Sequence, residues 1–429
     1  MTPALGLYTD LYELTMAAAF LREGPHEEAT FDLFVRSLPA NREFLVVAGI
    51  DTAVERLQAF TFDEFALAYL GSLGLFDERF LEYLETFRFA GQVRAIPAGE
   101  LVYADEPILS VTAPILDAQL LETLLINTVG FETMVASKAA RVAQACRGRA
   151  FVDFSARRDH GLEAALAVAR AAHIAGAVGT SLIEAGRRYG FALSGTMAHS
   201  FVMAHDHEID AFRCYLRQFG PASVLLVDTY DTREGTRRAV EAMRLEGVGA
   251  RGIRIDSGDL AELAFDCRRI LDDGGYPAVQ ILVSGDLDEE RIAAVLDAGA
   301  PIDAFGIGTR MGTSADAPYL GMVYKLVELG GEPRVKLSPE KRTLPGRKQV
   351  WRSPGEDVLA LASEPGPAGA RPLLVPVFDR GPLETVGTLA DARVRCAASL
   401  AAWTGQPPAL RISDGLARVT AEAAGEVTL

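Results

Sequence analysis

The stretch Ser223-Val-Leu-Leu-Val-Asp228 sets the fold class when it is taken with the helical pattern at residues 232–245 and the second short apolar run, Gly252-Ile-Arg-Ile-Asp256. Two short apolar runs joined by an amphipathic helix predict parallel strands with a crossover helix between them. The unit recurs about every 25–40 residues from residue 150 to 310, as it does in barrels of repeated β/α units. The chain is therefore predicted to contain an irregular α/β barrel.

The barrel is predicted to contain six strands that can be read from the sequence. They are Ala150–Phe154, Phe191–Gly195, Ser223–Asp228, Gly252–Asp256, Val279–Ser284 and Ile302–Ile307. Amphipathic helices are predicted between them, each ending near a glycine, which is a common helix stop. These helices are Gly161–Ala175, Thr232–Leu245, Leu260–Leu271 and Asp288–Ala298.

The two flanks of the barrel have a different pattern. A helix is predicted at Leu11–Leu21, proline-punctuated strands at Gly91–Thr112, and antiparallel strands at Met322–Leu329 and Pro333–Leu337, with a basic turn after them at Lys341–Lys348. We interpret both flanks as one smaller α/β sandwich domain built from the two chain ends. The predicted division is residues 1–125 for its N-terminal part, 126–320 for the barrel, and 321–429 for the C-terminal segment that completes the sandwich.

Composition excludes several classes of protein. The 429 residues include 42 Lys and Arg against 58 Asp and Glu, a formal net charge of −16, which disfavours nucleic acid and anionic membranes as partners. No basic segment followed by an apolar run opens the sequence, and no apolar run has the length of a membrane span. Four widely spaced cysteines indicate neither a metal site nor a disulfide scaffold. We expect a cytoplasmic protein that captures anionic substrates with local arginines.

Polar or glycine-rich groups come after every predicted strand, and in parallel α/β folds the chemistry sits at these carboxyl ends. Aromatic and guanidinium groups there can stack a flat ring and neutralise a phosphate, and glycines let backbone N–H groups approach one closely. The candidates are Phe154, Arg157, Arg158, Thr196, His199, Asp228, Arg254, Asp256, Ser284, Gly285, Asp286, Gly306, Gly308 and Thr309. Arg254 and Asp256 should project to the same side because side chains alternate along a strand.

Each candidate also has a structural interpretation. A strand-end aspartate such as Asp256 or Asp286 is often a helix N-cap, a Gly-x-Gly-Thr run often only bends the chain, and a single histidine such as His199 is often a hydrogen-bonded structural residue. The coincidence of such groups at six successive strand ends favours a functional site. A purely structural barrel does not require it.

With these residues assembled, the sequence resembles the nicotinate phosphoribosyltransferase family over nearly its whole length. The matching segments are Thr9–Met16, Phe154–Arg158, Gly179–Ser181, Ser194–Phe201, Val227–Thr232, Ile255–Asp259 and Phe305–Thr309. The resemblance implies a type II phosphoribosyltransferase fold and a homodimer with active sites at its interface. It also implies a reaction in which nicotinate and 5-phosphoribosyl 1-diphosphate give nicotinate mononucleotide and diphosphate, with ATP hydrolysed through a phosphohistidine and Mg²⁺ neutralising the diphosphate.

The resemblance also implies roles for individual residues. Phe154 would stack on the pyridine ring, and Tyr12 would close this sandwich from the partner subunit. His199 would accept the phosphoryl group of ATP, because imidazole has a large unprotonated fraction near neutral pH and can act as a nucleophile. Asp228 is our candidate for the carboxylate that orients it.

The remaining roles concern phosphates, the metal and the ribose. Arg157 and Arg254 would hold phosphate or carboxylate, and Gly306, Gly308 and Thr309 would cradle the 5-phosphate. Asp256 and Asp286 would bind Mg²⁺ or the ribose hydroxyls. Carboxylates beside an oxocarbenium-like ribose and cations around the departing diphosphate both lower the barrier to displacement. Arg158, Thr196, Ser284 and Gly285 complete the predicted substrate-binding set.

Alternatives remain open. A nicotinamide phosphoribosyltransferase would use the same barrel, although the pair Arg157 and Arg158 favours an anionic carboxylate. A non-catalytic barrel that binds phosphorylated metabolites would not require His199, and a Schiff-base lyase would need a strand-end lysine, which none of the six strands supplies. His205 and His207 suggest a metal site by their spacing, but two histidines without a third ligand usually lie on a solvated loop.

Overall fold

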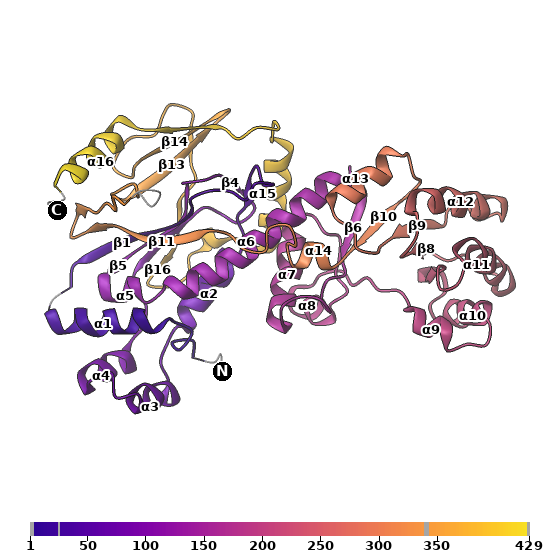
Figure 1. The fold of residues 1–429 in the computed structure, drawn as a ribbon, viewed down its shortest axis with the longest axis horizontal. Coiled ribbons are helices and arrows are strands. Elements are labelled where there is room, and N and C mark those ends of the chain that lie inside the picture. Colours follow the sequence, from indigo (N-terminus) through magenta and orange to yellow (C-terminus); the bar gives the residue numbers. More distant parts are fainter. Residues whose placement is uncertain (1–3, 25, 339–342, 427–429) are drawn as a thin grey trace. The chain divides into compact units, whose positions relative to one another are not determined.

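The computed structural model describes residues 4–24, 26–338 and 343–426, which form two compact units. One unit comprises the chain up to Ser137 and from Tyr319 onward, and the other comprises Lys138–Pro318 (Figure 1). The helix α6 (Glu122–Ala145) belongs to both, so it runs through the first predicted boundary at residues 125 and 126. The second division falls two residues before the predicted one.

The unit formed by residues 138–318 contains a five-stranded sheet in which every recorded pairing is parallel, in the order β6-β10-β9-β8-β7. Its strands are β6 (Ala150–Asp153), β7 (Val224–Leu226), β8 (Gly252–Ile255), β9 (Gln280–Val283) and β10 (Ala304–Ile307). Short, nearly continuous aliphatic strands suit a sheet that helices cover on its faces. The predicted α/β class with parallel strands is confirmed.

Two isolated bridges extend this sheet beyond β6. Thr180 pairs in parallel with Asp153, and Leu193 pairs in parallel with Thr180. The predicted strand Phe191–Gly195 is therefore wrong as a full strand, because Leu193 alone pairs, and the position of Thr180 was missed. Within the described part of this unit no pairing joins Leu193 to β7, so closure into a barrel stays a prediction.

The helices of this unit begin and end where local chemistry requires. Asp231 accepts a hydrogen bond from the N–H of Glu234 and so caps α11, which Gly247 ends in the left-handed conformation that glycine adopts without strain. The helices are α7 (Leu162–Ile174), α8 (Ile183–Tyr189), α9 (His199–Met203), α10 (Glu208–Phe219), α11 (Thr232–Glu246), α12 (Leu260–Asp273), α13 (Glu289–Asp297) and α14 (Thr309–Gly312), with a 3₁₀ turn at Gly220–Ala222.

The other unit is organised by an antiparallel six-stranded sheet, in the order β12-β11-β1-β5-β3-β16. The strands are β1 (Glu28–Val35), β3 (Gln92–Ala95), β5 (Pro107–Pro114), β11 (Met322–Leu329), β12 (Glu332–Pro333) and β16 (Val375–Asp379). The central strand β1 is buried from its second residue onward, because β5 and β11 flank it on both edges. Segments from both chain ends thus share one sheet, in which the predicted strand Pro333–Leu337 is shortened to its first residue.

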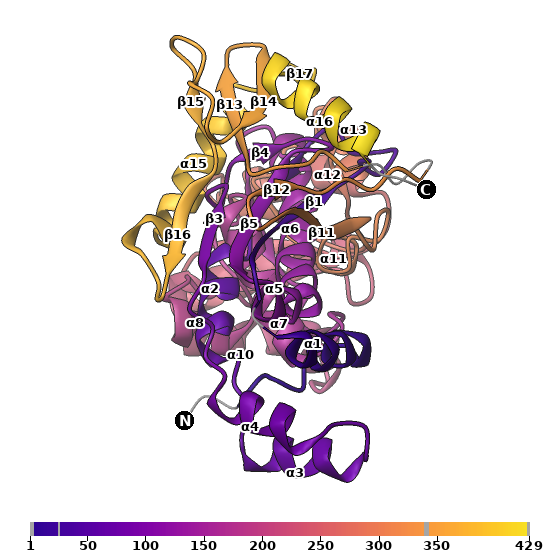
Figure 2. The same ribbon diagram turned by 90° about the vertical axis from the view of Figure 1, so that its left-hand side faces the viewer.

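The same unit carries a four-stranded sheet, in the order β15-β13-β14-β17, which Figure 2 shows beside α16. Its strands are β13 (Lys348–Ser353), β14 (Glu356–Leu361), β15 (Arg371–Pro372) and β17 (Ala409–Ile412), and a separate pair is β2 (Leu45–Val46) with β4 (Leu101–Val102). The remaining helices are α1 (Leu11–Glu23), α2 (Ile50–Ala59), α3 (Glu64–Ser72), α4 (Glu78–Thr86), α5 (Ile115–Gln119), α15 (Leu389–Ala401) and α16 (Asp414–Glu426), with a 3₁₀ turn at Glu384–Val386.

Two further predictions, the basic turn and the absence of a membrane span, can be compared with the structure only over the described residues. The basic turn Lys341–Lys348 begins with Lys341 and Arg342, which lie outside the described residues. Among the helices that the structure does describe, none combines the length and the apolar character needed to cross a bilayer.

Candidate active site

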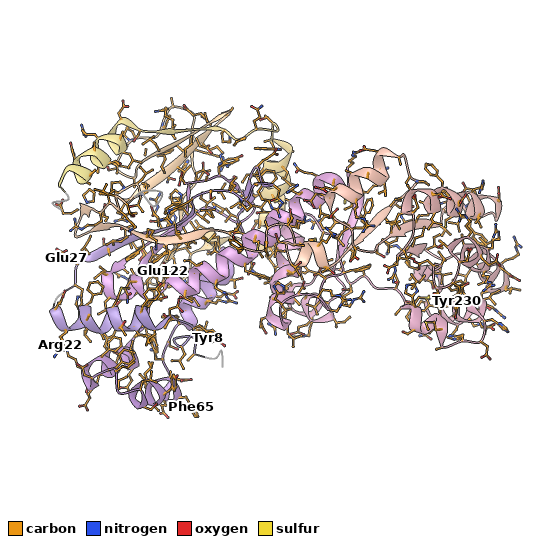
Figure 3. The ribbon with its side chains drawn as sticks, viewed as in Figure 1. Tyr8, Arg22, Glu27, Phe65, Glu122 and Tyr230 are labelled. Carbon is orange, nitrogen blue, oxygen red and sulfur yellow. The ribbon has the colours of Figure 1, made fainter. Side chains whose placement is uncertain are left out.

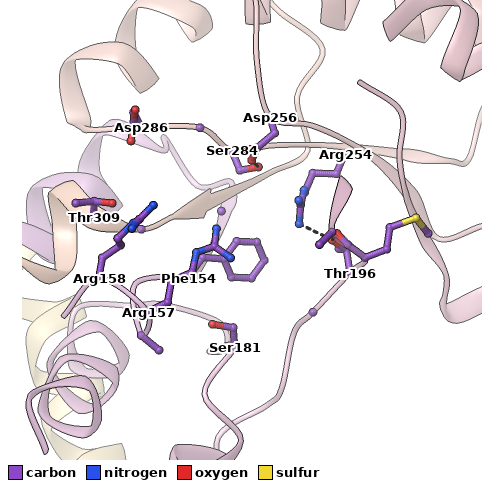
Figure 4. Close-up of a pocket in the computed structure, with 17 residues that line it drawn as sticks. Phe154, Arg157, Arg158, Ser181, Thr196, Arg254, Asp256, Ser284, Asp286 and Thr309 are labelled. Atoms are coloured by element: carbon purple, nitrogen blue, oxygen red, sulfur yellow. Dashed lines mark hydrogen bonds between the residues drawn. The ribbon is translucent and has the colours of Figure 1, made fainter. Parts of the chain in front are cut away.

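A cavity of about 600 Å³ opens at the carboxyl ends of the parallel strands (Figure 4). All of its lining residues belong to the unit of residues 138–318. They are Phe154, Ala156, Arg157, Arg158, Ser181, Gly195, Thr196, Met197, Ala198, Arg254, Asp256, Ser284, Gly285, Asp286, Gly306, Gly308 and Thr309. The residues predicted for the site are all among them, except Tyr12, His199 and Asp228.

The acidic side of the cavity is held by a chain of hydrogen bonds between neighbouring strand ends. Ser284 donates through Oγ to Oδ1 of Asp256, whose own N–H donates to Oδ2 of Asp228 at 2.9 Å. The hydroxyl of Ser257 donates to the same oxygen of Asp228 at 2.6 Å. Gly285 has φ of 99°, and a Cβ there would lie 2.0 Å from the carbonyl oxygen of Asp256, so only glycine fits. The carboxylate of Asp256 is thus fixed in position.

The structure separates the aspartates that cap helices from those that face the cavity. Asp259 accepts two backbone N–H bonds at the start of α12, and Asp288 accepts one at the start of α13. Asp256 and Asp286 cap neither helix and line the cavity instead. The N-cap interpretation that their position allowed does not hold for either residue.

These two carboxylates fit a magnesium ion that is held mainly by a substrate. Mg²⁺ usually takes one or two protein carboxylates and fills its other positions with water and phosphate oxygens. Among the described residues no three His, Cys, Asp or Glu side chains are grouped as a complete metal site. Asp256 and Asp286 could therefore supply two of the oxygen ligands of such an ion.

Arg254 belongs to β8 and lines the cavity. It donates from Nη1 to the hydroxyl of Thr196, and its Nε has no hydrogen-bond partner among the described residues. Burial lowers the pKa of Arg254 and the neighbouring Asp256 carboxylate opposes that shift, so the guanidinium stays charged. A half-buried cation with an unused donor is suited to an anionic ligand.

The opposite side of the cavity, at β6 and β10, carries an aromatic ring and two arginines. The N–H of Phe154 donates to the carbonyl of Ile307 at 2.7 Å, which continues the pairing beyond β6. A Cβ on Gly306 would lie 2.6 Å from the Phe154 ring, so this glycine leaves the space that the ring occupies. Arg157 and Arg158 come next on the same turn, are exposed, and line the cavity.

A buried cluster lies beneath this turn. Asp153 accepts from the N–H of Ser155 at 3.0 Å, from its hydroxyl at 2.6 Å, and from the hydroxyl of Thr180 at 2.8 Å. The Ser155 oxygen also lies 3.0 Å from Oδ2 of Asp159. Burial raises the pKa of Asp153 and raises that of Asp159 to about 6. A Cβ on Gly312 would lie 2.2 Å from Oδ1 of Asp159, so the carboxyl packs against the backbone of α14.

His199 is the first residue of α9 and lies beside the cavity, since its neighbour Ala198 lines it. Its Nδ1 lies 3.2 Å from the hydroxyl of Thr229, and its Nε2 lies 3.9 Å from Oδ1 of Asp228. That oxygen of Asp228 is buried and has no hydrogen-bond partner among the described residues, whereas the imidazole is 40% exposed. Tyr230, which follows Thr229 in the chain, is exposed (Figure 3). An accessible imidazole beside a buried carboxylate is a suitable nucleophile.

The other two histidines of this region are His205 and His207. Nδ1 of His205 lies 2.9 Å from the carbonyl oxygen of Phe201, and its ring packs edge-on against the Phe201 ring. His207 directly precedes α10. No third metal ligand joins them in the described part of the chain.

Tyr12 lies on α1 in the other unit, where its side chain is 45% exposed. Burial and the carboxylate of Glu122 (Figure 3) raise its pKa, so the phenol is neutral. Its predicted stacking role across a dimer interface stays a prediction.

Five residues that line the cavity were not predicted from the sequence, namely Ala156, Ser181, Gly195, Met197 and Ala198, and neither were Thr229 and Ser257. Ser181 lines the cavity from the segment after Thr180, and Thr229 and Ser257 contact His199 and Asp228 respectively. These three hydroxyl residues lie one to three residues after a strand or bridge position. A systematic reading of every hydroxyl at such positions could have found them.

The comparisons with known proteins agree on one family. Residues 7–130 match the family model described as nicotinate phosphoribosyltransferase (NAPRTase) N-terminal domain, and residues 149–349 match that of the nicotinate phosphoribosyltransferase (NAPRTase) family. The chain is 47% identical over 380 residues to nicotinate phosphoribosyltransferase pncB2 of Mycobacterium tuberculosis, covering 87% of this chain and 82% of that protein. It is 42% identical to nicotinate phosphoribosyltransferase of Bacillus subtilis, covering 81% and 73%. The crystal structure of human nicotinic acid phosphoribosyltransferase superposes with a TM-score of 0.86 at 28% identity, covering 96% and 99%.

Proposed function

Because the chain belongs to the nicotinate phosphoribosyltransferase family, we propose that it is an enzyme of NAD biosynthesis that joins nicotinate to the ribose of 5-phosphoribosyl 1-diphosphate. The products are nicotinate mononucleotide and diphosphate. The observation that carries this proposal is the cavity at the strand ends, where an aromatic ring, three arginines and two carboxylates lie together. Each of these groups matches one part of the two substrates.

The reaction breaks the bond between ribose C1 and the diphosphate oxygen and forms a bond from C1 to the pyridine nitrogen. Positive charge develops on the ribose and negative charge on the departing diphosphate. The fixed carboxylate of Asp256 is suited to stabilise the positive charge on the ribose, and the half-buried guanidinium of Arg254 is suited to stabilise the negative charge on the diphosphate. The ring of Phe154 would stack on the pyridine ring of nicotinate. The carboxylate of nicotinate would pair with Arg157 or Arg158.

Mg²⁺ would be held by Asp256 and Asp286 together with the diphosphate. When bound, the ion would neutralise charge on the leaving group. The two side chains contribute only part of a coordination shell, in keeping with an ion that enters with the substrate.

ATP would act through His199. An imidazole nitrogen attacks the γ-phosphorus, ADP leaves, and water later cleaves the phosphohistidine to inorganic phosphate. Support comes from the exposure of the ring and from its partners, since Thr229 and the buried Oδ1 of Asp228 each lie beside one ring nitrogen.

A homodimer is supported by the apolar surface of α1 and of the turn before it. Leu7, Tyr8, Leu11, Tyr12 and Met16 are all at least 39% exposed, which is unusual for a cluster of large apolar side chains within ten residues. A second copy of the chain covering this surface would bring Tyr12 to an interface, where an aromatic ring could stack on the substrate of the partner.

The runner-up function is transfer to nicotinamide, and the arginines favour nicotinate over it. A neutral amide gains no ion pair from Arg157 or Arg158, both of which line the cavity.

The deciding experiment supplies purified protein with 5-phosphoribosyl 1-diphosphate, Mg²⁺, ATP and either nicotinate or nicotinamide, and separates the products chromatographically. Nicotinate mononucleotide should form, with nicotinamide giving at most a small fraction of that rate. Product from nicotinamide alone would overturn the substrate assignment, and no product from either base would favour a binding-only protein.

A further inference from the structure

One hydroxyl group lies between two carboxyl groups beneath the arginine-bearing turn. The oxygen of Ser155 is 2.6 Å from Oδ1 of Asp153 and 3.0 Å from Oδ2 of Asp159. A serine hydroxyl has a single proton to donate but has lone pairs that accept. The single proton can point along only one of these contacts, so two full hydrogen bonds require that one of the carboxyl groups itself carries a proton and donates it to Ser155.

The position of that proton can be assigned from the other contacts. Asp153 accepts three hydrogen bonds, two from Ser155 and one from Thr180, and these stabilise its ionised form. Asp159 has only its contact to Ser155, and its Oδ1 is buried without a hydrogen-bond partner among the described residues. The shorter contact, to Asp153, takes the Ser155 proton, so Asp159 is the group that donates.

We propose that Asp159 is a positioning residue that works in its protonated form, so that binding of the anionic substrate is coupled to a proton on its carboxyl group. This inference rests on the proposed function of the cavity. The protonated carboxyl joins the turn that carries Arg157 and Arg158 to β6 through Ser155, and to α14 through its packing against Gly312. Residues at both ends of this connection line the cavity.

Loss of the proton changes the local charge in two ways. An ionised Asp159 cannot donate to Ser155, and its negative charge lies close to that of Asp153, which already opposes ionisation. It also places an anion one residue from Arg158, which weakens the attraction that the arginines exert on phosphate or carboxylate. Both effects lower the affinity of this turn for an anionic substrate.

Other charged groups near Asp159 do not replace this effect. His160 is its neighbour in the chain and favours the ionised form. On α14, Arg310 is engaged with Asp288 at 2.9 Å. The burial of Asp159 and the charge of Asp153 both favour the protonated form, and burial is the larger cause. The midpoint of the transition therefore lies near pH 6, and an arriving anion would move it upward.

Asparagine provides a sharp test because its amide donates a hydrogen bond as the protonated carboxyl does but does not titrate. Binding of 5-phosphoribosyl 1-diphosphate to the full chain is measured by calorimetry between pH 6 and pH 8. The protonated fraction of a group with a pKa of about 6 falls from roughly one half to roughly one hundredth over this range. The Kd of the unchanged protein should rise about tenfold or more. Titration of the substrate's own phosphates affects the Kd of both proteins equally. Apart from that shared effect, the Kd of Asp159→Asn should change by about twofold or less.

Two further variants keep the test decisive. Asp159→Ala should bind weakly throughout. His160→Gln changes the exposed neighbour of Asp159 in the chain and should retain the pH dependence of the unchanged protein. Thermal unfolding checks that each variant is folded. If Asp159→Asn shows the same pH dependence as the unchanged protein, or if Asp159→Ala binds as tightly as it, the inference is overturned.

The same samples separate this inference from the proposed function. Turnover of saturating nicotinate is measured in parallel, and kcat should be nearly equal for the unchanged protein and Asp159→Asn, because a positioning residue alters KM. If product forms but the unchanged protein and Asp159→Asn have the same pH profile of KM, the inference about Asp159 is overturned and the proposed function stands. Absence of product, with the difference in Kd intact, would overturn the proposed function alone.

Discussion

The two sides of the cavity hold their charges by different means. After β7 and β8 the carboxylates of Asp228 and Asp256 are fixed by hydrogen bonds from a backbone N–H and from serine hydroxyls, and Gly285, which tolerates no Cβ, lies against the backbone of Asp256. At β6 and β10 the charges are the long, exposed side chains of Arg157 and Arg158, whose positions depend on the turn beneath them. Fixed groups can stabilise a developing charge without reorganising, whereas adjustable groups suit capture of a substrate. The first side should therefore control kcat and the second KM.

The largest expected effect on kcat comes from removing a charge on the side of the cavity where hydrogen bonds fix the carboxylates. Asp256→Asn preserves shape and the contact with Ser284, but removes the negative charge beside the reacting ribose. Preorganised groups of this kind are worth about 100- to 1000-fold in rate, so kcat for mononucleotide formation should fall by about that factor with a smaller change in KM. Steady-state kinetics measure both values. A change confined to KM would show that Asp256 serves substrate binding, and would contradict the division of the cavity into a side that controls kcat and a side that controls KM.

His199→Asn tests the ATP proposal. Labelling by ATP carrying a tagged γ-phosphate should disappear, and the ATP-dependent gain in activity should be lost, while the activity without ATP is retained. His205→Asn is the matched control, because this neighbouring histidine is held by the carbonyl of Phe201 and should leave labelling unchanged. Persistent acid-labile label in His199→Asn would show that another residue accepts the phosphoryl group.

Gly306→Ala tests the side that captures the substrate. The new methyl group would meet the Phe154 ring at 2.6 Å and displace it from its stacking position. Aromatic stacking contributes about 1 kcal/mol, so KM for nicotinate should rise about five- to tenfold with little change in kcat. In Gly308→Ala the methyl group would meet the Phe154 carbonyl oxygen at 3.3 Å, a milder contact, and KM should change less. Equal effects of the two variants would indicate that the ring does not contact nicotinate.

The smallest effect concerns stability. Because the folded state raises the pKa of Asp159 from the ordinary value to about 6, it binds the proton more tightly than the unfolded state does. The contribution of Asp159 to the free energy of unfolding is therefore largest below pH 4 and declines as the pH rises to about 6. Relative to the unchanged protein, Asp159→Asn should gain about 1 kcal/mol between pH 4 and pH 7, a figure reduced for partial exposure. Urea unfolding at the two pH values measures it, and a relative loss would contradict the assigned proton.

The site could be predicted from sequence where chemistry depends on position along a strand. Phe154, Arg254 and Asp256 were found because parallel strands bring their carboxyl ends to one edge. The roles of neighbouring aspartates could not be separated, since Asp256 and Asp259 both come after the same strand and only the point where α12 begins decides which of them caps it. The predicted strand at residues 191–195 failed because its apolar pattern could not show that Leu193 alone has a pairing partner.

Residue patterns along the chain were enough to establish the α/β class, the parallel order of strand and helix, the family, and the edge of the sheet at which polar groups gather. These features depend on periodicity and on local residue preferences, which are properties of neighbouring positions. The folded structure was needed to show that Ser155 is shared between Asp153 and Asp159, that Asp228 faces His199, and that Gly306 makes room for Phe154. Protonation and steric fit depend on distances between segments remote in sequence, and packing alone sets those distances.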